Sequence, residues 1–142
     1  VLNEGLIERT GISGEQVDQV VEQERKELQR RRASYRGDAP EPEVNGRHVI
    51  LVDDGLATGS TMYAAAQAVR ARDPRRLVIA VPVAPSRTLD KLLDVADEIL
   101  CPLTPNNFQA VGQWYDRFDQ TTDDEVRQLL SDQPVPQTRT NL

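Results

Sequence analysis

The fold of this chain is indicated most clearly by the stretch Val49-Ile50-Leu51-Val52-Asp53-Asp54-Gly55-Leu56-Ala57-Thr58-Gly59-Ser60-Thr61. Four apolar residues lead into two adjacent carboxylates and a turn of small residues, and an alanine-rich helical pattern follows over Met62 to Arg72. A continuous apolar run bounded by turn signals is typical of a strand buried on both faces. The turn then brings backbone N–H groups and small hydroxyls to the start of a helix, where a phosphate group binds readily.

Strands and helices alternate along the sequence outside this stretch. His48 to Asp53, Leu77 to Val83 and Glu98 to Cys101 are the three strand candidates. Strands that are separated by helices predict a parallel sheet of the α/β class, with helices on both faces. Helix starts are marked by capping boxes at Ser13 with Gln16 and at Thr122 with Glu125, and by an N-cap at Ser86. Shorter helical sequence runs from Asn3 to Gly11.

The acid pair followed by a Thr-Gly-Ser-Thr turn resembles the phosphoribosyl-diphosphate motif of type I phosphoribosyltransferases. The resemblance implies that Asp53 and Asp54 act in catalysis by binding the ribose hydroxyls, and that Asp53 also approaches a magnesium ion. It further implies a loop that wraps the 5-phosphate with backbone amides and hydroxyls, formed by Gly55, Ala57, Thr58, Gly59, Ser60 and Thr61. The alternative is an ordinary strand-turn-helix with Thr58 as the helix N-cap, although capping alone does not require two adjacent aspartates.

The residues just before the acidic strand, Ala33 to Gly46, are predicted to form a mobile loop because glycine and proline interrupt them. The resembled family carries a flexible catalytic loop at this place. Tyr35 and Arg36 would then shield the reacting sugar and offer charge to the diphosphate. A plain linker with an anchoring tyrosine is the equal alternative.

The segment Phe108 to Phe118 resembles the base-binding segment of purine salvage phosphoribosyltransferases, with one additional residue between Phe108 and Gly112. The resemblance implies that Phe108 stacks on the base and that Asp116 approaches the metal or the diphosphate. Phe108 in the core is the alternative. Trp114 and the aromatic residues after it are expected to fill interior space, as bulky aromatic side chains usually do.

Composition excludes several classes of protein. The formal charge of −6 argues against general binding of nucleic acid or anionic membranes. No apolar run approaches the ~20 residues of a membrane span. The single cysteine, Cys101, forms no internal disulfide and is expected to be a small buried hydrophobe in a cytoplasmic protein. The only histidine, His48, lacks partners for catalysis and is expected at the surface.

The predicted sheet is incomplete, since three buried strands leave an apolar edge exposed. In the resembled family the first strands and the diphosphate loop precede this point. We therefore expect residues 1–130 to be the C-terminal part of a phosphoribosyltransferase domain, and residues 131–142 to be a disordered tail. Such a fragment is expected to be inactive alone, and to form a homo-oligomer or associate with the missing N-terminal half.

The function that the resemblance implies is transfer of ribose 5-phosphate between phosphoribosyl diphosphate and a nitrogenous base, with Mg²⁺. Hypoxanthine–guanine enzymes place an acid at the position of Ala57, so a 6-oxopurine acceptor is disfavoured and the acceptor stays open. The alternative is a regulatory protein that binds phosphoribosyl diphosphate without transferring it. A nucleotide-dependent oxidoreductase is disfavoured because no G-x-G-x-x-G follows a strand. A receiver-like phosphoacceptor is disfavoured because the phosphorylated aspartate of a receiver is not followed by a Thr-Gly-Ser-Thr turn.

Overall fold

The computed structural model describes residues 13–37 and 39–131, which form two compact units. One unit comprises residues 41–118. The other contains the long helix that precedes residue 37 and the helix that follows residue 122. The helix expected from Asn3 to Gly11 and the tail expected beyond Ser131 lie outside the described residues.

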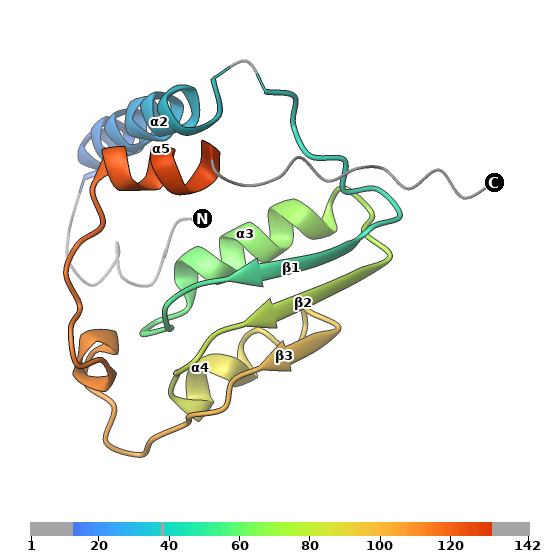
Figure 1. Ribbon diagram of the computed structural model, residues 1–142, viewed down its shortest axis with the longest axis vertical. Helices are drawn as coiled ribbons and strands as arrows, with labels where there is room; N and C mark the ends of the chain where they lie inside the picture. Colours follow the sequence, from blue (N-terminus) through green and yellow to red (C-terminus); the bar gives the residue numbers. More distant parts are fainter. Residues whose placement is uncertain (1–12, 38, 132–142) are drawn as a thin grey trace. The chain divides into compact units, whose positions relative to one another are not determined.

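Parallel strands form the centre of the unit 41–118 (Figure 1). Strands β1 (His48–Val52), β2 (Arg76–Ala80) and β3 (Glu98–Leu100) pair in the order β1-β2-β3. Both pairings are parallel, with Ile50 opposite Val78 and Val78 opposite Glu98. This arrangement confirms the α/β class. The second strand ends earlier than predicted, and pairing resumes only as an isolated bridge between Val83 and Leu103, because Pro82 has no N–H group to donate.

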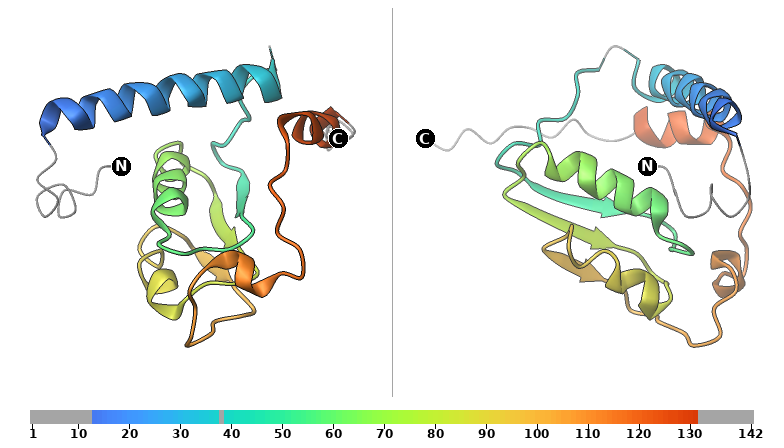
Figure 2. Two further views of the ribbon diagram at one scale, coloured as in Figure 1. Left: turned by 90° about the vertical axis from the view of Figure 1, so that its left-hand side faces the viewer. Right: turned by 180° about the vertical axis from the view of Figure 1, so that it is seen from behind.

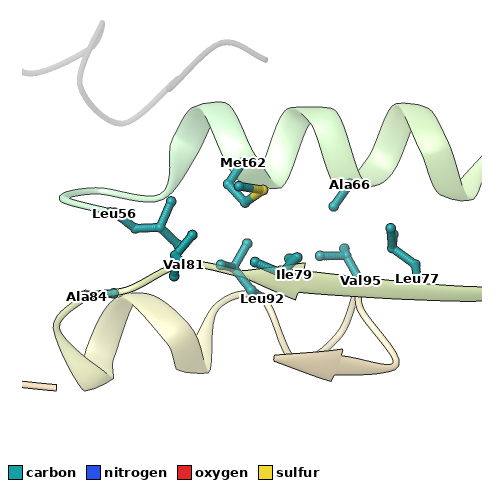
Figure 3. Packing of buried hydrophobic residues seen from close by; sticks show 9 residues of the cluster. All are labelled: Leu56, Met62, Ala66, Leu77, Ile79, Val81, Ala84, Leu92 and Val95. Carbon is teal, nitrogen blue, oxygen red and sulfur yellow. The ribbon is translucent and has the colours of Figure 1, made fainter. Parts of the chain in front are cut away.

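Helices α3 (Ser60–Arg70) and α4 (Ser86–Asp90) lie on the same side of this sheet, as the edge-on view in Figure 2 shows. They cover one continuous apolar core that lies between α3 and the sheet (Figure 3). Its buried members are Leu56, Met62, Ala66, Leu77, Ile79, Val81, Ala84, Leu92 and Val95. The N-cap predicted at Ser86 is wrong: Ser86 is the first helical residue, and the cap position is Pro85.

The opposite face of the sheet has no helix of this unit on it. Side chains at alternate strand positions point to opposite faces, so Val49 and Leu51 pack against the core while Ile50 and Val52 are 62% and 74% exposed. The prediction that the strand of the quoted stretch is covered on both faces is therefore not met within this unit.

The second unit pairs helix α2 (Gly14–Arg36) with helix α5 (Asp123–Ser131). Both predicted capping boxes are present: Ser13 Oγ accepts the Gln16 N–H at 3.3 Å, and Thr122 Oγ1 accepts the Glu125 N–H at the same distance. In each box the longer side chain accepts the N–H of the cap residue in return. No helix of the described residues is both long and apolar enough to cross a membrane.

Candidate functional site

The candidate site begins where strand β1 ends, with two exposed carboxylates. Asp54 donates its backbone N–H to Asp53 Oδ1 at 2.9 Å. The carbonyl of Asp54 accepts a hydrogen bond from Tyr115 Oη at 2.6 Å. Both aspartates follow the carboxyl end of a parallel strand, which is the edge where open α/β sheets bind ligands.

The surroundings of Asp54 raise the pKa of its carboxyl. Partial burial raises the pKa of the Asp54 carboxyl above its ordinary value of 3.8, and the neighbouring charge of Asp53 raises it further. Hydrogen-bond donors or a cation beside the carboxylate act in the opposite direction, because they favour its charged form. A donor or a cation beside Asp54 would therefore lower the pKa of its carboxyl.

This shift predicts that Asp54 destabilises the free protein at neutral pH. A carboxyl whose pKa is higher in the folded state favours folding below its unfolded pKa, and loses that contribution as the pH rises through the folded pKa. Asp54→Asn, which carries no charge, should raise the urea unfolding midpoint near neutral pH. The gain should vanish below the ordinary value of 3.8. A variant that is no more stable than wild type at neutral pH would contradict this prediction.

The loop after the acid pair is anchored on its inner side and open on its outer side. The Leu56 side chain is only 3% exposed, and its backbone N–H donates to the carbonyl of Val83 at 3.0 Å. The Ala57 carbonyl accepts the Thr88 hydroxyl at 2.8 Å. The polar side chains that follow, those of Thr58, Ser60 and Thr61, are exposed. The loop thus presents hydroxyls to solvent, while its backbone is held by hydrogen bonds to Val83 and Thr88.

Gly59 occupies the N-cap position of α3 in a left-handed conformation, with φ of 75°. The cap makes no side-chain hydrogen bond, so the alternative interpretation of Thr58 as the N-cap is wrong. Thr58 Oγ1 instead accepts a long bond, 3.4 Å, from the Ser60 N–H. Two reasons favour glycine at this position. L residues rarely adopt this φ, and a Cβ would lie 2.7 Å from Thr88 Cγ2.

The segment after strand β3 contains the short helix η1 (Val111–Trp114), which packs against Gly55, the residue after the acid pair. A Cβ at Gly55 would lie 2.7 Å from Val111 Cγ1, so glycine permits this close approach. The ring of Tyr115 lies 5.2 Å from that of Phe118. These rings are 37% and 50% exposed, so the prediction that they fill interior space is wrong. Sequence reasoning missed the contact of Tyr115 with the acid loop.

The predicted base and metal residues belong to the same unit as the acid pair. Phe108 is half-buried in the loop before η1, and Asp116 is exposed. Within the described residues no three His, Cys, Asp or Glu side chains gather as a metal cluster. Magnesium is usually held by one or two carboxylates together with water and substrate phosphates, and Asp53 and Asp116 are exposed carboxylates. The base-stacking role of Phe108 and the metal roles of Asp53 and Asp116 stay predictions.

Tyr35 and Arg36 lie in the last turn of α2, so the prediction that a loop begins at Ala33 is wrong. Tyr35 Oη donates to Asp123 at 2.5 Å, and this bond is the main reason that the pKa of Tyr35 is raised. The Arg36 guanidinium donates to the carbonyl of Pro40 at 3.0 Å. These contacts favour the anchoring interpretation of Tyr35. The catalytic roles of both residues stay predictions.

The remaining candidate residues have ordinary environments. His48 is exposed, as predicted. Cys101 is half-buried, and burial is the main cause of the raised pKa of its thiol. A raised pKa disfavours the nucleophilic thiolate.

Comparison with known proteins gives consistent matches. The family model described as "Phosphoribosyl transferase domain" matches residues 7–116. Two proteins of Mycobacterium tuberculosis that carry the provisional name phosphoribosyl transferase, MT0597 and Rv0571c, are each 40% identical over 130 residues. The match covers 92% of this chain and 29% of each relative. The crystal structure of TT1426 from Thermus thermophilus is 37% identical with a TM-score of 0.72, over 84% of this chain and 57% of that one.

Proposed function

Because the chain belongs to the phosphoribosyl transferase domain family, we propose that it binds phosphoribosyl diphosphate and transfers ribose 5-phosphate to a nitrogenous base in the presence of Mg²⁺. One observation carries the proposal. An exposed acid pair and a loop with a left-handed glycine at a helix start follow the same strand, within a few residues of each other. Carboxylates accept hydroxyl donors, and a helix N-terminus favours a phosphate.

The predicted residues of the unit 41–118 have distinct roles in this proposal. Asp53 and Asp54 accept hydrogen bonds from the ribose hydroxyls. The backbone and hydroxyls of residues 57–61 bind the 5-phosphate. Phe108 stacks on the base.

Transfer breaks the bond between the anomeric carbon and the diphosphate oxygen and forms a bond from that carbon to a base nitrogen. The leaving diphosphate takes the bonding electrons, and positive charge develops on the sugar as in an oxocarbenium ion. Asp53 and Asp116 would hold magnesium, which would neutralise part of the charge of the diphosphate. The chain itself contributes positioning, because the acid pair and the loop hold the two ends of the ribose phosphate. Ala57 performs no proton transfer, so an acceptor that must lose a proton needs another base.

Calorimetric titration with phosphoribosyl diphosphate and Mg²⁺, followed by assay of diphosphate release with a panel of nucleobases, tests the proposal. Binding is the expected result for this chain. Because the chain spans only 29% of each relative, base-dependent diphosphate release is expected from a protein that spans the relatives' full length. Binding without release by that longer protein would instead indicate the regulatory alternative. Absence of binding would overturn the proposal as a whole.

A further inference from the structure

We propose that Thr88 is a positioning residue that orients the backbone amides of the loop 57–59 toward the bound phosphate. Thr88 lies in α4, outside the sequence motif and 31 residues from Ala57. The inference rests on the proposed function, because it assigns a role within that same phosphate site.

Thr88 is held firmly enough to act as a support. Its side chain is among the most buried of the chain, with 2% exposure, and it is the one buried polar residue of the described ranges. Its backbone N–H donates to the carbonyl of Pro85 at 2.9 Å. A buried hydroxyl that lacks a partner is costly, so the hydrogen bond to the Ala57 carbonyl fixes both groups.

The hydroxyl of Thr88 sets the direction of the peptide between Ala57 and Thr58. It donates to the Ala57 carbonyl oxygen at 2.8 Å. A trans peptide is planar, and its C=O and N–H point in opposite directions; the described residues contain no cis peptide bond. The carbonyl is therefore drawn toward α4, away from an anion that it would repel, and the Thr58 N–H is directed to the opposite side.

The methyl group of Thr88 lies against Gly59, the residue of the loop at which α3 is capped. Thr88 Cγ2 lies only 2.7 Å from the position that a Cβ on Gly59 would take. The methyl thus packs against the left-handed residue from which α3 begins. The Leu56 N–H also donates to the Val83 carbonyl. Segment 83–88 therefore contacts the loop at Leu56, Ala57 and Gly59. Donors that are oriented before the ligand arrives bind a charge more strongly than donors that must reorganise.

Two substitutions separate the hydroxyl from the methyl. Thr88→Val keeps the branched shape and removes the donor, so ribose 5-phosphate should bind roughly tenfold more weakly, which corresponds to loss of one well-oriented hydrogen bond. Thr88→Ser keeps the donor, so its affinity should stay within about twofold of wild type if the hydroxyl sets the loop. Calorimetric titration with ribose 5-phosphate measures all three proteins.

Leu77→Val is the matched control for loss of stability. Leu77 is fully buried at the end of the core that lies away from Leu56 and Ala84, as Figure 3 shows. The Leu77→Val variant should have a lower urea unfolding midpoint than wild type and the same affinity for ribose 5-phosphate. Amide spectra that report Thr58 and Ser60 should shift in Thr88→Val and stay close to wild type in Leu77→Val.

The outcomes distinguish this inference from the proposed function. Binding by wild type with equal affinity in Thr88→Val would overturn the positioning role and leave the proposed function standing. An equal loss in Thr88→Val and Leu77→Val would also overturn it, since general destabilisation would then explain the effect. Absence of binding by wild type would overturn both.

Discussion

The double variant Asp53→Asn, Asp54→Asn is expected to bind ribose 5-phosphate at least about tenfold more weakly than wild type. A hydrogen bond to a charged group contributes about 1.5–3 kcal/mol, and a tenfold change in affinity corresponds to about 1.4 kcal/mol. The amide of asparagine keeps one acceptor oxygen and loses the charge. Both side chains are exposed at the end of β1, so the variant should fold, and isothermal calorimetry measures the affinity.

Asp90→Asn, Asp94→Asn is the charge-matched control, because it removes two exposed carboxylates from the same unit. It should leave the affinity within about twofold of wild type, since neither carboxylate belongs to the acid pair or to the loop after it. Equal weakening in the two double variants would mean that net charge, rather than contact with the sugar, accounts for the effect. Unchanged affinity in a folded Asp53→Asn, Asp54→Asn variant would remove the role assigned to the acid pair.

Gly59→Val should abolish measurable phosphate binding, which is the larger of the two effects. A β-branched residue at φ of 75° is a conformational outlier, and such strain costs about 1–3 kcal/mol. Its Cβ would also collide with Thr88 Cγ2, at 2.7 Å. The loop must therefore move, and its amides lose their alignment. Calorimetry should detect no binding, and the urea midpoint should fall.

A smaller substitution separates strain from collision. Gly59→Ala introduces both, whereas Gly46→Ala introduces strain alone, because Gly46 has φ of 65° with nothing within 4 Å of its Cβ position. Gly59→Ala should therefore lower the urea midpoint more than Gly46→Ala does. Adding Thr88→Ser removes the colliding methyl, so the double variant should recover to the level of Gly46→Ala. A double variant that is less stable than Gly59→Ala would contradict the contact between these residues.

Local signals made much of the fold predictable from the sequence. The first strand is an uninterrupted apolar run, and the predicted range His48 to Asp53 differs from β1 by one residue. The box at Ser13 with Gln16 depends on groups three residues apart, which the sequence displays directly. The acid pair and the loop after it are adjacent in the sequence. The position of both at the end of one strand could therefore be predicted.

Contacts between distant residues could not be predicted in this way. Tyr115 and Asp54 are 61 residues apart, and Tyr35 and Asp123 are 88 residues apart. No spacing rule links such pairs, because tertiary packing alone brings them together. Thr88 illustrates the same point, since in the sequence it is an ordinary residue of a short helix. The predicted loop begins at Ala33, four residues too early. The helix continues to Arg36 and ends at Gly37, the first glycine or proline of the segment.

The exposed face of the sheet also differs from the sequence prediction for a physical reason. An apolar strand such as β1 predicts burial on both sides, but the sequence does not say which element provides the second cover. In the unit 41–118, helices α3 and α4 lie on one side. Ile50 and Val52 stay exposed on the other.

We propose that the loop after β1 binds the phosphate of a phosphorylated ribose. The most direct measurement is titration of the ¹⁵N-labelled chain with ribose 5-phosphate, followed through the backbone amide resonances. We expect saturable shifts that are largest for Thr58, Gly59, Ser60 and Thr61, with smaller shifts for Asp53 and Asp54. Shifts that saturate at another part of the chain, or no shifts at millimolar ligand, would contradict it.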